Sequence, residues 1–86
     1  MFSVYILKSK KDGNLYIGST NNLKRRLLEH NRGLNFSTKF RIPFELIYCE
    51  IYKTEGDARD REYNLKFRAN ALSQLKRRLS KSLKTD

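Results

Sequence analysis

Five side chains in this sequence have the types and the order needed for chemistry on a phosphodiester. Tyr5 and Tyr16 lie on either side of a turn, Arg26 and His30 follow one helical turn apart, and Glu62 comes later. Arginine can bind a phosphate through two parallel hydrogen bonds. Each residue alone has a common structural explanation, but their order together indicates phosphate chemistry.

The charge of the chain indicates a polyanionic partner. Its 86 residues suffice for one compact domain, residues 1–86, and 19 Lys and Arg against 9 Asp and Glu give a formal net charge of +10. Nucleic acid is the first candidate, because neutralising phosphates releases counterions. No apolar run is long enough to span a bilayer, which argues against a membrane. One cysteine and one histidine make an internal disulfide or a zinc cluster impossible and fit a reducing cytoplasm.

The first part of the chain predicts a β-hairpin. Residues 2–7 and 15–18 are rich in β-branched and aromatic residues, and Asp12-Gly13 between them is a strong turn signal. A two-residue turn pairs Tyr5 with Thr20, whereas a four-residue loop pairs Tyr5 with Gly18. Either register places Tyr5, Tyr16 and Gly18 on one face of the sheet. Gly18 then either leaves a notch between two phenol rings or simply ends the strand.

A helix is expected after the hairpin. Asn21 or Asn22 is its cap, and Gly33 is a natural left-handed end. We expect the leucines of this helix to face the core. Arg26 and His30 are four residues apart and therefore lie on a single flank.

The second half predicts one strand and two helices. Residues 44–52 are largely apolar on both faces, which is typical of a strand in the middle of a sheet covered on both sides. Thr54 opens a helix that we expect to end at about Asn70, and a last helix with a leucine face begins at Leu72. Glu62 lies near the packed arc of the first of these helices. It either serves the chemistry or forms an ordinary ion pair with an arginine such as Arg26.

Together these residues resemble the GIY-YIG nuclease superfamily, in particular its small single-domain bacterial members. The resemblance extends from Ser3 to about Leu79. It depends on Ser3-Val4-Tyr5 in the GIY position, Tyr16-Ile17-Gly18 in the YIG position, the run 19–27 followed by Glu29-His30, and Arg61-Glu62 leading into Leu65-Lys66. It implies an α+β fold in which helices flank a central three-stranded antiparallel β-sheet, in the order β-β-α-β-α-α. The order expected from the residues agrees.

The same resemblance implies a metal-dependent endonuclease that hydrolyses phosphodiester bonds in DNA, with RNA also open as a substrate. Glu62 is then the ligand of Mg²⁺ or Mn²⁺, with water and phosphate completing the coordination. Arg26 stabilises charge on the scissile phosphate. Tyr5 takes the proton of the attacking water, which requires nearby positive charge to lower its pKa, and Tyr16 positions water or phosphate. His30 orients water, moves a proton or is structural.

Further residues are expected to contact the nucleic acid. They are small, polar or basic and lie beside the YIG position, on the first helix or in the polar connection 35–41: Gly18, Lys24, Arg25, Thr38, Lys39 and Arg41. An asparagine beyond the metal glutamate, common in the superfamily, is matched by Asn64 or Asn70. Ser3 replaces the first glycine of the signature.

The substrate and the specificity stay open at this point. We expect low sequence specificity or recognition of DNA structure, with a protein partner as another source of specificity. The competing interpretation is a basic nucleic-acid-binding module with weak or no catalysis. A structural domain on ribosomal RNA would explain the charge but not the two tyrosines and Gly18.

Overall fold

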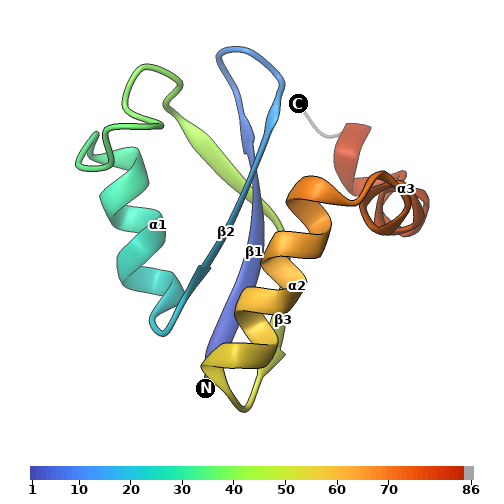
Figure 1. Ribbon diagram of the computed structural model, residues 1–86. Helices are drawn as coiled ribbons and strands as arrows, with labels where there is room; N and C mark the ends of the chain where they lie inside the picture. The colour runs from blue at the N-terminus through green and yellow to red at the C-terminus, as the bar shows by residue number, and fades with distance from the viewer. Residues whose placement is uncertain (85–86) are drawn as a thin grey trace.

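The computed structural model describes residues 1–84 as an antiparallel sheet with helices on both faces (Figure 1). The elements in chain order are β1 (Phe2–Ser9), β2 (Leu15–Thr20), α1 (Leu23–Asn31), β3 (Phe44–Tyr52), α2 (Glu55–Phe67), α3 (Ala69–Arg78) and a 3₁₀ turn (Ser82–Lys84). The predicted α+β class and the order β-β-α-β-α-α are confirmed.

The strand order is β2-β1-β3, so β1 is the central strand. The expectation that residues 44–52 form the middle strand is therefore wrong: β3 is an edge strand, and its Cys49 and Ile51 are exposed. Apolar residues on both faces indicate that helices can cover both faces of a strand, but they do not indicate which strand has a partner strand on each side. Residues 3–7 of β1 are all buried, because β1 has a partner strand on each side and helices on both faces.

The hairpin has the register of the longer loop. Tyr5 pairs with Gly18 and Leu7 pairs with Tyr16, which places both tyrosines on one face as predicted. The loop closes through a hydrogen bond from the Ser9 N–H to the Asn14 carbonyl, and Gly13 adopts φ 74°. Glycine tolerates this left-handed conformation without steric cost.

Each face of the sheet has its own apolar cluster. One cluster contains Tyr5, Leu7 and Phe44 and is covered by α1, while the opposite cluster is covered by α2 and α3 and includes Ile6 and Leu65. Figure 1 shows α1 on one side of the strands and α2 with α3 on the other. The edge strand β2 therefore lies between α1 and α2, and side chains from both helices can meet there.

The helix boundaries differ partly from the prediction. Asn22 caps α1, with its Oδ1 accepting from the Arg25 N–H at 3.0 Å, and Thr54 caps α2 in the same way through the Asp57 N–H at 3.2 Å. Helix α2 ends at Phe67 rather than Asn70, because Arg68 has extended backbone angles (φ −117°, ψ 103°) and α3 begins at once. Within residues 1–84, the helices lack the combined length and apolar character needed to cross a membrane.

Candidate active site

Tyr5 and Gly18 are packed directly against each other. Tyr5 is 1% exposed, and a Cβ atom added to Gly18 would lie 2.5 Å from the Tyr5 hydroxyl oxygen and 2.7 Å from its Cζ. Gly18 is thus needed to make room for Tyr5, and the expected notch is filled by the Tyr5 hydroxyl. Gly18 is buried, so the expectation that it contacts nucleic acid is corrected to this packing role.

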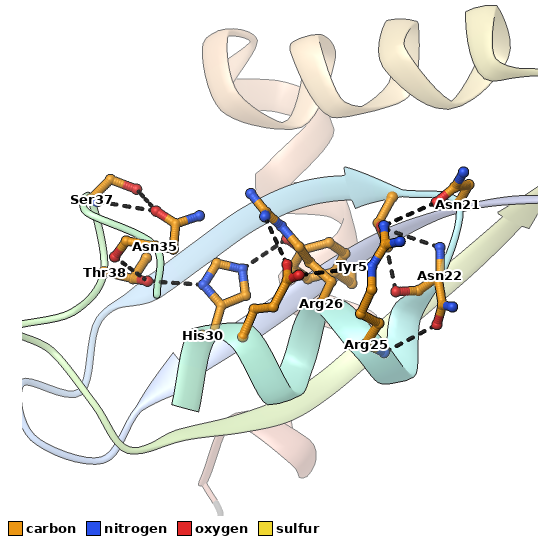
Figure 2. Close-up of polar contacts among 11 residues, drawn as sticks. Tyr5, Asn21, Asn22, Arg25, Arg26, His30, Asn35, Ser37 and Thr38 are labelled. Atoms are coloured by element: carbon orange, nitrogen blue, oxygen red, sulfur yellow. Dashed lines mark hydrogen bonds and ion pairs between the residues drawn. The ribbon is translucent and has the colours of Figure 1, made fainter. Parts of the chain in front are cut away.

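A hydrogen-bonded chain connects Tyr5 to the α1–β3 connection (Figure 2). The Tyr5 hydroxyl lies 2.9 Å from His30 Nε2, and His30 Nδ1 lies 2.9 Å from Thr38 Oγ1. Thr38 Oγ1 in turn donates to the Asn35 carbonyl at 3.5 Å. His30 and Thr38 are both completely buried. His30 thus occupies the core side of α1, while the neighbouring Leu28, expected in the core, is 46% exposed.

The Asn35 carbonyl, which can only accept a hydrogen bond, indicates the direction of these hydrogen bonds. Because Thr38 Oγ1 donates to the Asn35 carbonyl, we infer that it accepts from a protonated His30 Nδ1 and that the unprotonated Nε2 accepts from the Tyr5 hydroxyl. Burial lowers the pKa of His30, and the positive charge of Arg26 acts in the same direction, which keeps the imidazole neutral. The Tyr5 proton therefore points at a neutral nitrogen.

The Tyr5 phenol is strongly held in its protonated form. Burial raises the pKa of Tyr5 to about 12, although the nearby Arg26 acts in the opposite direction. A free tyrosinate at neutral pH would therefore be rare. Any loss of the Tyr5 proton is easiest when His30 Nε2 receives it at once.

Arg26 links Tyr5 to Glu29. Its Nη1 donates to Glu29 Oε1 at 3.1 Å, and its guanidinium lies beside Tyr5 (Figure 2), close enough to oppose the rise of the Tyr5 pKa. Burial disfavours its charge, but the neighbouring Tyr5 and Glu29 raise the pKa of Arg26 overall. Arg25 also pairs with Glu29, at 3.8 Å. Arg26 is thus a fixed, half-exposed cation beside the Tyr5 hydroxyl.

Tyr16 completes the aromatic part of the site. Its ring centroid lies 5.0 Å from that of His30 and 6.4 Å from that of Tyr5. Tyr16 is more exposed than Tyr5. The two tyrosines are thus close together, as predicted, but solvent reaches them unequally.

Glu62 approaches β2 from the other face of the sheet. Its Oε1 accepts from Ser19 Oγ at 2.6 Å and its Oε2 accepts from Lys66 Nζ at 2.7 Å. Successive residues of a strand point to opposite faces, so Gly18 faces Tyr5 while Ser19 faces Glu62. Ser19 thus contacts Glu62, although the sequence analysis assigned it no role. Its position at the start of the signature run 19–27, directly after Gly18, was the available signal. The alternative pairing of Glu62 with Arg26 does not occur among the ion pairs of the described residues.

Glu62 has the donor chemistry of a magnesium ligand. Burial opposes its ionisation, but hydrogen bonds from Lys66 and Ser19 lower the pKa of Glu62 overall, so the carboxylate is charged at neutral pH. Residues 1–84 contain no cluster of three or more His, Cys, Asp or Glu side chains arranged around a metal position. A single carboxylate fits an ion that keeps most of its coordination for water and phosphate, as Mg²⁺ does. Asn64 and Asn70 are both exposed, and the choice between them stays a prediction.

A polar pocket of about 250 Å³ lies between α1 and α2 beside β2. Its lining includes Ser19 and the three arginines Arg25, Arg26 and Arg59. Arg59 precedes Glu62 by one helical turn and was not predicted. Three guanidinium groups around one pocket make it suitable for a phosphate.

The connection 35–41 contributes differently from what its polarity predicts. Thr38 is completely buried and bonded to His30, so the expected contact of Thr38 with nucleic acid is corrected to a role inside the site. Arg41 pairs with Asp12 at 2.7 Å and lowers the pKa of Asp12 to about 2, so its charge is already engaged in holding the hairpin loop. Lys39 lies over the rings of Phe36 and Phe40, at 4.7 and 4.9 Å from their centroids. Contacts of nucleic acid with Lys24, Arg25, Lys39 and Arg41 remain predictions.

The fold and this arrangement of side chains define a GIY-YIG domain. The GIY-YIG catalytic domain model matches residues 1–78, and the chain belongs to this family of nucleases, which implies a nucleic-acid substrate. Among its relatives, a UPF0213 protein of Staphylococcus saprophyticus is 41% identical over 64 residues, 73% of this chain and 77% of the relative. A UPF0213 protein of Clostridium perfringens is 45% identical over the same length, covering 68% of that protein, and one of Staphylococcus aureus Mu50 is 44% identical with 77% covered. No solved structure matches the chain significantly.

Proposed function

We propose that this protein is a divalent-metal-dependent endonuclease that hydrolyses phosphodiester bonds in DNA. The observation that supports this most is the meeting of two sets of groups at the edge strand β2. Tyr5, His30 and Arg26 lie on one face of the sheet, and Glu62 reaches the neighbouring residue of β2 from the other face. A protein that only binds nucleic acid needs positive charge, but not a directed proton path beside an ionised carboxylate.

The proton path runs through Tyr5 to His30. Tyr5 Oη accepts a proton from the attacking water while its own proton passes to His30 Nε2, 2.9 Å away. The hydroxide then forms a bond to phosphorus, the bond from phosphorus to the leaving oxygen breaks, and the leaving oxygen takes a proton from solvent. His30 afterwards returns its proton to Tyr5, and Tyr5 releases its extra proton to solvent. This transfer avoids a free tyrosinate, whose formation is unfavourable because the pKa of Tyr5 is about 12. His30 accepts the proton because burial has kept it neutral.

Arg26 and Glu62 deal with negative charge on the phosphate. The Arg26 guanidinium is fixed by Tyr5 and Glu29 and partly open to solvent, so it can stabilise the charge that develops on the phosphoryl oxygens. Glu62 would hold Mg²⁺ or Mn²⁺, which when bound supplies a Lewis acid for the same oxygens. Tyr16, the more exposed tyrosine, would orient the water or the phosphate.

Cleavage assays with isosteric variants test the proposal. Single-stranded, duplex and branched DNA, and RNA of matching sequence, are incubated with the protein and Mg²⁺ or with EDTA. Tyr5→Phe, His30→Gln and Glu62→Gln are each expected to lower the cleavage rate by about 10²-fold or more, the usual contribution of a catalytic acid–base or electrostatic group. Asp60→Asn is the matched control, because Asp60 is an exposed carboxylate on the same helix that lines neither pocket beside Glu62.

Binding measured in EDTA separates catalysis from affinity. Glu62→Gln should bind DNA at least as tightly as the wild type, since the variant removes a negative charge. Mg²⁺-dependent nicking that persists in Glu62→Gln and Arg26→Ala would refute the site. Binding without cleavage of any substrate would favour the nucleic-acid-binding module instead.

A further inference from the structure

An exposed aromatic pair lies beside Glu62 on the surface of α2. Tyr63 is 55% exposed and Phe67 is 68% exposed, and their ring centroids are 4.9 Å apart. These residues are one helical turn apart, so both rings project from the same flank of α2. Two neighbouring rings left largely in water offer a flat apolar surface for a ligand.

The surroundings of this pair are basic and adjoin the catalytic residues. A shallow pocket of about 260 Å³ is lined by Tyr63, Phe67, Arg59, Lys66 and Glu62. Lys66 pairs with Glu62 at 2.7 Å and Arg59 pairs with Glu55 at 3.4 Å, so a phosphate bound here would compete with these two carboxylates. Arg59 also lines the pocket of three arginines between α1 and α2. Arg59 thus borders both the pocket suited to a phosphate and the pocket with the two aromatic rings, and Glu62 lines the aromatic pocket.

We propose that Tyr63 and Phe67 bind an unstacked base of a nucleotide next to the scissile phosphate, while Arg59 and Lys66 contact its backbone. This deepens the proposed function by naming the substrate class: DNA in which the base beside the cleaved bond is free of its neighbours. A nucleotide carries the two chemistries that the pocket offers to bind, a π-face for the rings and a phosphate for the cations. The net charge of +10 favours the same polyanionic occupant over an apolar protein segment.

Anisotropy titrations of a labelled oligonucleotide in EDTA test this binding site without cleavage. The wild type should bind a short single strand more tightly than the same sequence as a duplex. Phe67→Ala and Tyr63→Ala should each weaken single-strand binding by about 5- to 150-fold, the usual effect of losing one base–aromatic stack. Phe67→Leu keeps an apolar side chain but not the ring and should bind the single strand as weakly as Phe67→Ala. Phe67→Trp keeps an aromatic ring and should bind the single strand as tightly as the wild type.

Ile51→Ala is the matched control, because Ile51 is a 56% exposed apolar residue on the edge strand β3, away from the pocket of Tyr63 and Phe67. It should leave the affinity within twofold. An oligonucleotide whose bases are replaced by abasic sites should bind the wild type and Phe67→Ala equally. The salt dependence should stay unchanged in Phe67→Ala but become shallower by about 0.7 in the logarithmic slope in Arg59→Gln, as expected for one lost phosphate contact on a single strand.

Three results would overturn the proposal. They are equal losses of single-strand affinity in Phe67→Ala and Ile51→Ala, equal affinity of the wild type for single strand and duplex, and a dimer in sedimentation experiments that Phe67→Ala dissociates. A wrong assignment of the catalytic residues would give another result. Cleavage would then persist in Glu62→Gln, while the single-strand affinities of the wild type and Phe67→Ala would still differ as expected.

Discussion

Replacing Thr38 by valine tests the hydrogen-bonded chain at its buried end. Threonine and valine have nearly the same shape, so the substitution removes the hydroxyl with little change in packing. The Asn35 carbonyl keeps two other donors, the backbone N–H groups of Thr38 and Lys39 at 3.1 and 3.0 Å. The loss is therefore confined to His30, whose Nδ1–H is left without its acceptor.

The size of the effect follows from the burial of His30. The imidazole is completely buried, so water cannot replace Thr38 Oγ1. Leaving a buried donor unsatisfied costs about 1–3 kcal/mol in the free energy of unfolding. The other tautomer offers no escape, because its Nε2–H would face a Tyr5 hydroxyl that then loses its own acceptor.

Urea unfolding followed by circular dichroism measures this cost, together with the cleavage rate of the folded variants. Thr38→Val should lower both stability and rate. Thr38→Ser retains the hydroxyl and should retain most of the rate, although it loses a buried methyl group. Ser37→Ala is the surface control and should change the unfolding free energy by less than about 0.5 kcal/mol. A Thr38→Val protein as stable and as active as Ser37→Ala would refute the role of the buried His30–Thr38 hydrogen bond.

Three further predictions concern the same site. In absorbance titrations of the tyrosines, Tyr5→Phe should remove one phenol that ionises only at high pH, because burial raises the pKa of Tyr5 to about 12. The pKa of Tyr52 is also raised to about 12, so the ionisation of Tyr52 should remain in the variant as the internal reference. The urea midpoint should fall as the pH drops from 7 to 5, because the unfolded chain protonates His30 below about 6.5 while its native pKa is lower, and a midpoint that is flat over this range would contradict a neutral His30. Gly18→Ala should lose about 1–3 kcal/mol of stability and most of the cleavage rate, because the new Cβ overlaps the Tyr5 hydroxyl, whereas Gly56→Ala, with open space at its Cβ, should be neutral or slightly stabilising in the same unfolding assay.

The sequence by itself determined the elements and the family. Local signals decide where strands and helices begin, so Asn22 and Thr54 cap the helices as the pattern predicts. The parity of a hairpin fixes which side chains share a face, so Tyr5, Tyr16 and Gly18 came together in either register. The signature residues identified the family, which the match over residues 1–78 confirms.

Tertiary structure decided which strand is central and what each polar residue contacts. Strand order depends on which free strand edge the last strand pairs with, and apolar periodicity does not specify this edge. Because β3 pairs with β1, β3 is an edge strand. The polar sequence around Thr38 predicts a surface position for this residue. In the folded chain Thr38 is buried against His30. Ser19 and Glu62 meet across 43 residues of sequence because α2 packs beside the edge strand β2. Such contacts depend on the placement of distant segments, which spacing along the chain does not specify.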